Sequence, residues 1–201
     1  MSEAIFKTVG QALYISFLME IITPGAKSST DSVINSLMEN CGMVFDGYRE
    51  NCVNTRGMTV DEWRGQCAII RQMVTDELPK PEKYAIWARY AQYDNRIKVI
   101  TKADGVEGIA HHVESVCSIK GDTLLELCVN FYGLHTFNAK GKRINPPSLR
   151  SISDKYHKSL TTLTRSKQVI AAHAAELEMI ALSRLEPLIQ RKKLTNETVS
   201  A

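Results

Sequence analysis

Basic side chains gather in one segment of this 201-residue chain, and such a cluster can bind anions. Between residues 140 and 167, eight lysines and arginines stand against a single acid, Asp154, which gives the segment a net charge of +7. The whole chain carries +3, so the remainder carries −4. A basic segment on a mildly acidic body favours a polyanion as partner, and a charged face that is only solvated is the alternative.

The sequence contains no recognisable catalytic motif and no phosphate-binding loop. The chain has no G-x-S-x-G, no H-E-x-x-H, no glycine-rich phosphate loop and no Ser/His/Asp arrangement. Asp61 and Glu62 suit the first turn of a helix, where negative charge complements the helix dipole. We therefore expect a protein that is not an enzyme and uses no cofactor.

Histidines and cysteines form only a loose zinc pattern. His111 and His112 precede Cys117, and Cys128 precedes His135. Structural zinc sites use tight pairs such as C-x₂₋₄-C or H-x₃₋₅-H, and adjacent histidines point to different faces of a helix. The sequence therefore predicts no bound metal.

An aromatic stripe at helical spacing is a second candidate for nucleic-acid contact. It consists of Tyr84, Trp87, Tyr90 and Tyr93, with Arg89 and Arg96 nearby. Such a stripe can stack single-stranded bases. Aromatic side chains more often form the buried face of a helix, so the pattern favours a core position.

The residues from 148 to 170 fit two helices joined by a tight turn. Such a pair needs apolar residues at fixed offsets and a small residue where the helices cross. The apolar positions are Leu149, Ile152 and Tyr156 in the first helix and Leu163, Val169 and Ile170 in the second. Ser153 is the small residue at the crossing, and Ser159 is suited to cap the second helix.

This stretch resembles the helix-turn-helix of bacterial and phage transcription proteins, including the last DNA-binding region of sigma factors. The matching pattern is Leu149-x-x-Ile152-Ser153-x-x-Tyr156 followed by Ser159-x-Thr161-Thr162-Leu163-x-Arg165, about a tenth of the chain. His157 stands where glycine usually makes the left-handed turn, and Lys158 stands where an aliphatic residue usually packs. Histidine is among the non-glycine residues enriched at positive φ.

The resemblance implies that the second helix enters the major groove of DNA. The side chains that would face bases are Ser159, Thr161, Thr162, Thr164, Arg165 and Gln168. Arginine pairs with guanine, glutamine with adenine, and threonine methyls contact thymine. The phosphate contacts would come from Arg150, Lys155, Lys158 and Lys167, with Lys140, Lys142 and Arg143 preceding them as a flexible basic arm.

Most of the chain is predicted to be helical. The expected helices cover residues 4–22, 29 or 30 to 41, 59–78, 81–93, 104–117, 122 or 123 to 133, and 148 to about 189. Thr59 and Glu62 form a capping-box pattern. Residues 134–147 are expected to be a basic loop, and the best candidate for a strand is 97–101.

Composition indicates a soluble globular protein, with 44% hydrophobic and 23% charged residues. The longest apolar stretch, residues 12–22, is interrupted by Ser16 and closed by Glu20, whereas a membrane span needs about 20 apolar residues. Glu3 and Glu20 argue against a secretory signal. Five cysteines without a C-x-x-C pair favour reduced thiols, so we expect a cytoplasmic protein without a membrane partner.

We therefore predict an all-α protein with a multi-helix body, residues 1–135, that binds a partner or dimerises. Residues 136–201 would hold the basic loop, the helix-turn-helix and a long terminal helix, from about Thr164 to Ile189, that packs on the body or dimerises. In size and arrangement the chain is similar to Q-type late-gene antitermination proteins of phages. That similarity implies sequence-specific binding to double-stranded DNA and contact with RNA polymerase or sigma factor.

Two alternatives stay open at this point. A repressor or activator that binds DNA as a homodimer would use the same motif and a palindromic site. A helical interaction module without DNA binding would leave the basic segment as a solvated face.

Overall fold

One helix begins at the capping box that the sequence predicts at Thr59 and Glu62. The computed structural model describes residues 5–20, 58–92, 101–138, 140 and 142–195. Before helix α3, Val60–Glu77, the Thr59 amide donates to the Glu62 carboxylate at 2.8 Å, and the Glu62 amide donates to the Thr59 hydroxyl at 3.3 Å. The predicted capping box is thus confirmed, and these bonds hold the pKa of the Glu62 carboxyl below its usual value.

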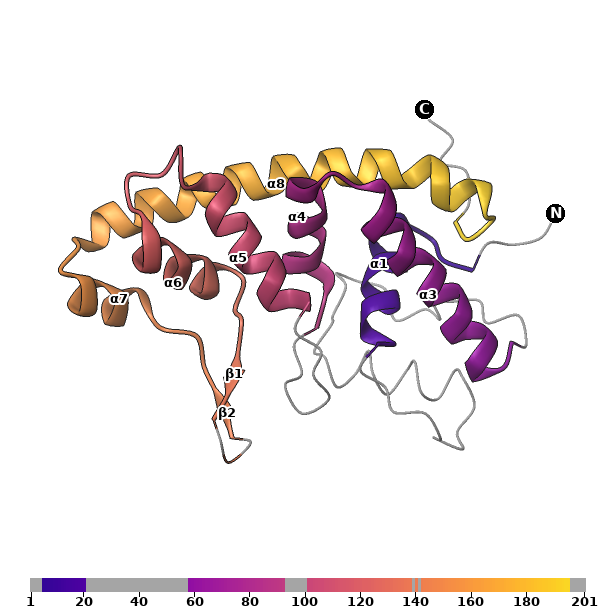
Figure 1. The fold of residues 1–201 in the computed structure, drawn as a ribbon, viewed down its shortest axis with the longest axis horizontal. Helices are drawn as coiled ribbons and strands as arrows, with labels where there is room; N and C mark the ends of the chain where they lie inside the picture. Colours follow the sequence, from indigo (N-terminus) through magenta and orange to yellow (C-terminus); the bar gives the residue numbers. More distant parts are fainter. Residues whose placement is uncertain (1–4, 21–57, 93–100, 139, 141, 196–201) are drawn as a thin grey trace. The chain divides into compact units, whose positions relative to one another are not determined.

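The described residues form seven helices and one short hairpin, so the fold class is all-α, as predicted. Besides α3, the helices in Figure 1 are α1 (Val9–Leu18), α4 (Lys80–Tyr90), α5 (Thr101–Val113), α6 (Gly121–Phe131), α7 (Leu149–Tyr156) and α8 (Leu160–Arg191). The two strands are β1 (Thr136–Phe137) and β2 (Arg143–Ile144). Within the described ranges, no helix is long and apolar enough to cross a membrane.

Several predicted boundaries differ from the observed ones. Helix α1 starts at Val9 because the Thr8 hydroxyl accepts from the Gln11 amide and caps the helix there. Thr101 begins helix α5 rather than ending a strand, and residues 97–100 lie outside the described residues. Helix α6 begins at Gly121, after Lys120, instead of being capped by Asp122 or Thr123. The helix predicted near 29–41 also lies outside the described residues.

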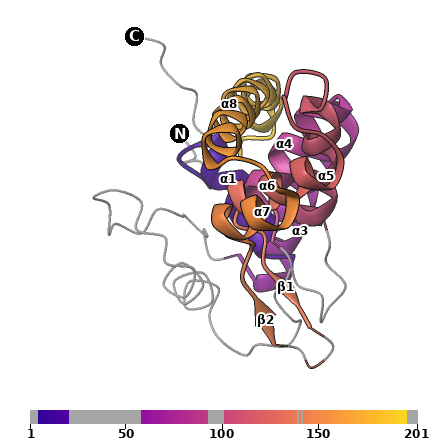
Figure 2. The same cartoon turned by 90° about the vertical axis from the view of Figure 1, so that its left-hand side faces the viewer.

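The predicted basic loop at 134–147 contains a small antiparallel hairpin. Thr136 pairs with Ile144 and Phe137 pairs with Arg143. The hairpin projects away from α6 and α7 in Figures 1 and 2. Backbone pairing therefore places Arg143 in a short strand, whereas the sequence predicted no secondary structure here.

The second helix of the predicted helix-turn-helix and the predicted terminal helix are one continuous helix. Helix α8 has 32 residues, and Pro187 lies inside it. No glycine interrupts the sequence between residues 160 and 191, which explains why no break separates the two parts.

Contacts divide the chain into two compact units. One comprises Met1–Glu77 and Leu182–Ala201, and the other comprises Leu78–Ala181. In the first unit, α1 packs on α3, the rings of Phe6 and Trp63 lie 5.3 Å apart, and the Phe6 amide donates to the Leu194 carbonyl at 2.8 Å. The boundary predicted at residue 135 falls inside the second unit.

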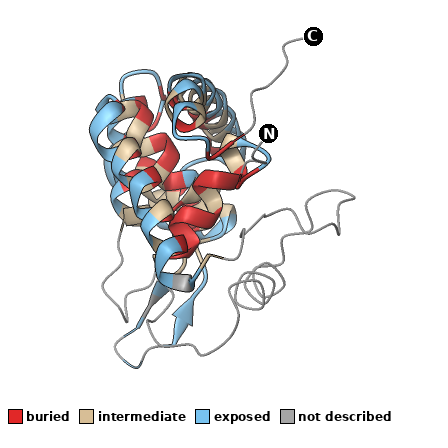
Figure 3. Cartoon of the chain, turned by 90° about the vertical axis from the view of Figure 1, so that its right-hand side faces the viewer, coloured by how far each residue is buried: buried red, intermediate tan, exposed pale blue. Residues whose placement is uncertain are grey.

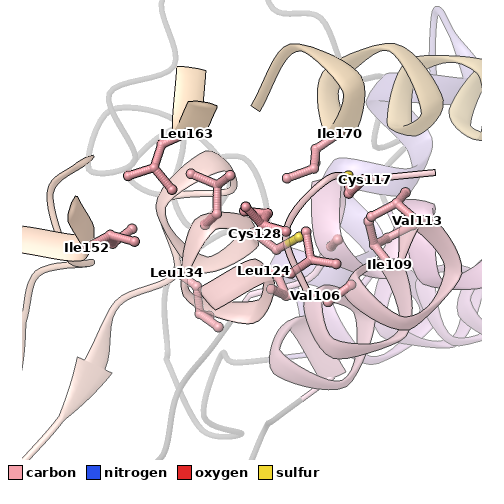
Figure 4. Close-up of a cluster of buried hydrophobic side chains, with 14 of the residues drawn as sticks. Val106, Ile109, Val113, Cys117, Leu124, Cys128, Leu134, Ile152, Leu163 and Ile170 are labelled. Carbon is pink, nitrogen blue, oxygen red and sulfur yellow. The ribbon is translucent and has the colours of Figure 1, made fainter. Parts of the chain in front are cut away.

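The second unit has its own hydrophobic core, which explains why residues 136–181 belong to it. Buried side chains from α5, α6, α7 and α8 meet there in one cluster. Figure 4 labels ten of them: Val106, Ile109, Val113, Cys117, Leu124, Cys128, Leu134, Ile152, Leu163 and Ile170. The predicted helix pair thus shares its core with α5 and α6 instead of forming a separate domain.

The aromatic stripe of α4 is only half buried. Tyr84, Trp87 and Tyr90 have intermediate exposure, and the buried face of α4 is made by Ala85, Ile86 and Ala88. The Tyr90 hydroxyl donates to the Glu178 carboxylate at 2.7 Å. The predicted core role therefore holds only in part, and Tyr93 and Arg96 lie outside the described residues.

Candidate nucleic-acid interface

Two helices and a three-residue turn form the candidate interface. The Ser148 hydroxyl accepts from the Ser151 amide at 3.1 Å and caps α7. The chain then reverses at His157, which has φ 51° and ψ 42°. Histidine therefore adopts the left-handed conformation predicted for this position.

Hydrogen bonds join this turn to α7 before it and to α8 after it. The Ser153 hydroxyl donates to the Lys158 carbonyl at 2.7 Å, and the Lys158 amide donates to the Ser153 carbonyl at 3.2 Å. The Ser159 hydroxyl accepts from the Thr162 amide at 3.1 Å, which confirms Ser159 as the cap of α8. The first turn of α8 is thus held at a defined position after α7.

Apolar packing fixes both helices on the second unit. Ile152, Leu163 and Ile170 are fully buried, and Leu149, Tyr156 and Val169 pack partly buried against the same core. The Ser166 side chain is buried as well, and its hydroxyl lies 3.1 Å from the hydroxyl of Ser118. The apolar positions predicted for the helix pair therefore face the core.

The six predicted base-facing residues fall into two groups. Ser159 and Thr162 are engaged within the cap, where their hydroxyls lie 2.8 Å apart, and Thr162 is partly buried. The other four, Thr161, Thr164, Arg165 and Gln168, are exposed on the first turns of α8. These four supply the donors, acceptors and methyl groups that base edges require.

Two of the predicted phosphate-binding lysines are engaged inside the protein. Lys155 forms an ion pair with Glu126, which raises the pKa of the lysine, and Glu126 also accepts from the Tyr156 hydroxyl at 3.1 Å. Lys167 is partly buried, and its ammonium donates to Asn130 Oδ1 at 2.8 Å. Sequence analysis missed both partners, Glu126 and Asn130, because their polar side chains on a helix carried no local signal.

The remaining predicted cations are exposed. They are Lys140, Lys142, Arg143, Arg150 and Lys158. Within the part of the chain that the structure describes, no side-chain hydrogen bond or ion pair engages Arg150 or Lys158. Arg150 lies in the first turn of α7, and Lys158 lies in the turn, two residues before the start of α8.

Leu160 is a surface residue that sequence analysis did not select. It is the first residue of α8 and is 48% exposed, whereas Leu163, one turn later, is fully buried. Periodicity alone does not reveal that the first residue of the helix is exposed while the residue one turn later is buried.

The histidines and cysteines considered as metal ligands do not come together within the described residues. His111 is exposed and lies 3.9 Å from Glu107, while Cys117 and Cys128 are buried free thiols. Among the described residues, no three histidine, cysteine or acidic side chains are grouped as metal ligands would be. Burial raises the pKa of the Cys128 thiol to about 12.

Comparison with known proteins adds no family to these observations. Neither the protein-family models nor the curated proteins compared with this sequence match it.

Proposed function

We propose that this protein binds double-stranded DNA in a sequence-specific manner and regulates transcription through the α7–turn–α8 unit. The observation that carries the proposal is the exposure of Thr161, Thr164, Arg165 and Gln168 on the first turns of a helix held by a closed turn. Helices placed in this way present their N-terminal residues to the major groove.

The charge around these residues supports the same partner. Arg150 on α7 and Lys158 in the turn are exposed, and their charges can contact phosphates. Lys155 and Lys167 are engaged by Glu126 and Asn130, so we assign these two lysines to holding α7 and α8 on α6 rather than to phosphate contact. Phosphate contacts set the position of a protein on DNA, whereas the α8 side chains would select the sequence.

The biological setting follows from the resemblance of the motif to phage transcription proteins. We propose a phage-encoded regulator of late-gene transcription, acting by antitermination or activation. Its remaining helices would contact RNA polymerase or sigma factor in the cytoplasm. A homodimeric repressor or activator is the main competing form of the same function.

Selection of bound sequences from a pool of random duplexes tests the proposal. An enriched motif is the expected result, and the same selection with Arg165→Ala should lose preference at one or two positions of that motif. A palindromic motif would favour the homodimer. Absence of any enriched sequence would contradict sequence-specific binding and leave a helical interaction module.

A further inference from the structure

Asn130 connects the candidate recognition helix to the segment that follows the hairpin. It lies on α6, and its Oδ1 accepts from the ammonium of Lys167 on α8 at 2.8 Å. Its Nδ2 donates to the carbonyl of Pro147 at 2.8 Å. One amide group therefore ties α8 and the chain between β2 and α7 to the same point on α6.

The chain between the hairpin and α7 is stiff as well as anchored. Pro146 and Pro147 lie between β2 and α7, and proline fixes the backbone φ angle near −65°. The position of the hairpin relative to α8 is thus constrained by two prolines and by the bond from Asn130.

The hairpin itself is organised by one asparagine at its tip. The Asn138 amide donates to the Lys142 carbonyl at 2.9 Å. The Asn138 side-chain oxygen accepts from the Lys140 amide at 3.0 Å and from the Lys142 amide at 2.9 Å. These three bonds link Asn138 to Lys140 and Lys142, so one side chain and one backbone pair join the two sides of the hairpin.

The charged side chains of the hairpin are all positive. Lys140, Lys142 and Arg143 are exposed, and the sequence from 134 to 147 contains no acidic residue. Figure 3 colours the described residues Thr136, Arg143 and Ile144 of the two strands as exposed. Three cations on a projecting backbone ribbon complement the phosphates of a nucleic-acid strand.

We propose that the β1–β2 hairpin is a second DNA-binding element, which contacts the sugar-phosphate backbone beside the α8 contact. Asn130 is the positioning residue that fixes the distance between the two elements. This inference rests on the proposed function. A hairpin held in this way protects DNA at one fixed end of the site, whereas a flexible arm would protect no defined position.

Hydroxyl-radical footprinting of the full chain on its selected DNA tests this arrangement. Lys142→Ala should remove protection at one end of the site, lower affinity about 3- to 10-fold and leave the selected motif unchanged. Lys80→Ala removes the same charge from the exposed start of α4 and is the matched control, which should leave the footprint intact.

Substitution of Asn130 tests the position of the hairpin without changing the charge of the hairpin. Asn130→Ala should weaken the same end of the footprint although all three hairpin cations remain. Because this change removes two bonds, the melting temperature of the variant is measured first. Asn130→Asp is the second variant, because it keeps the acceptor for Lys167 and loses the donor to Pro147; it should weaken the same end.

Two outcomes would overturn the inference, and they are distinguishable. A wild-type footprint that Lys142→Ala and Asn130→Asp leave unchanged would refute the hairpin contact while the proposed function stands. Absence of a protected site on any DNA would overturn the proposed function and this inference with it.

Discussion

The hydroxyl of Ser153 donates to the carbonyl of Lys158 at 2.7 Å, across the turn that joins α7 to α8. The Lys158 amide returns a bond to the Ser153 carbonyl at 3.2 Å. Ser153 thereby contacts the residue just before the cap of α8, and this pair of bonds sets the start of α8 relative to α7. The stability of the turn and the geometry of the candidate interface depend on the same residue.

Ser153→Ala should lower the free energy of unfolding by about 1 kcal/mol, because it leaves the Lys158 carbonyl without the hydroxyl donor. Denaturation in urea measures the change. Ser151→Ala, on the exposed side of α7, is the control and should change stability by less than about 0.5 kcal/mol. Equal effects of the two substitutions would contradict a specific role for the Ser153 hydroxyl.

His157 tests the left-handed turn directly, since its φ is 51°. His157→Gly should stabilise the protein by roughly 0.5–1 kcal/mol, because glycine adopts this conformation without steric cost. His157→Val should destabilise it by about 1–2 kcal/mol, because a β-branched residue is disfavoured there. Urea denaturation of the two variants and of the unchanged protein gives three midpoints for comparison. A lower midpoint for His157→Gly than for His157→Val would rule out this turn geometry.

Gly105 on α5 lies directly against the backbone of α4. A Cβ atom added at Gly105 would lie 2.5 Å from the Ala88 amide nitrogen, so Gly105→Ala forces the two helices apart. We expect a loss of about 1–3 kcal/mol in unfolding free energy. Gly65→Ala is the control, because nothing lies within 4 Å of its added Cβ, and it should stabilise α3 by about 0.5–1 kcal/mol. Thermal melting of both variants measures these changes, and a Gly105→Ala variant as stable as the unchanged protein would contradict the close contact between α4 and α5.

The features that the sequence predicted correctly depend on neighbouring residues. The Thr59–Glu62 capping box, the turn at His157 and the cap at Ser159 each involve residues within five positions of one another. Such interactions leave a pattern that can be recognised without knowledge of the fold.

The features that the sequence did not predict join residues far apart. Lys155 reaches Glu126 across 29 positions, and Lys167 reaches Asn130 across 37. The hairpin depends on strands of only two residues each, too short to show alternation. The roles of these lysines therefore became visible only when tertiary packing brought α6 beside α7 and α8.

Buried thiols should make the folded protein less stable at alkaline pH. Burial raises the pKa of Cys67 to about 11 and that of Cys128 to about 12, from an ordinary value of 9.0. Between pH 9 and 11 the unfolded chain loses protons that the folded chain retains, so unfolding becomes easier as pH rises through 9. At pH 8.5, mass spectrometry should find Cys67 and Cys128 alkylated only after addition of urea. Rapid alkylation of either thiol in the native protein would contradict its burial.

Arg165 and Lys158 should affect DNA binding in different ways. Arg165→Ala should lose about 1–3 kcal/mol on the selected site and relax preference at one or two base pairs. Lys158→Ala should weaken binding to all sequences about equally, because a phosphate contact carries no base information. Lys155→Ala should have a smaller effect on affinity than Lys158→Ala, since Glu126 already engages Lys155. Competition binding with selected and scrambled duplexes separates these effects, and identical profiles for Arg165→Ala and Lys158→Ala would refute the assigned orientation of α8.

The salt dependence of duplex DNA binding tests the central claim most directly. If the five exposed cations Lys140, Lys142, Arg143, Arg150 and Lys158 contact phosphates, the logarithm of the association constant should fall against the logarithm of salt concentration with a slope of about −4 to −5. Reversing the charge of Lys158 by Lys158→Glu should make that slope shallower. Weak binding with a slope near zero would show that the basic segment is a solvated face and would contradict the proposal that this protein binds DNA.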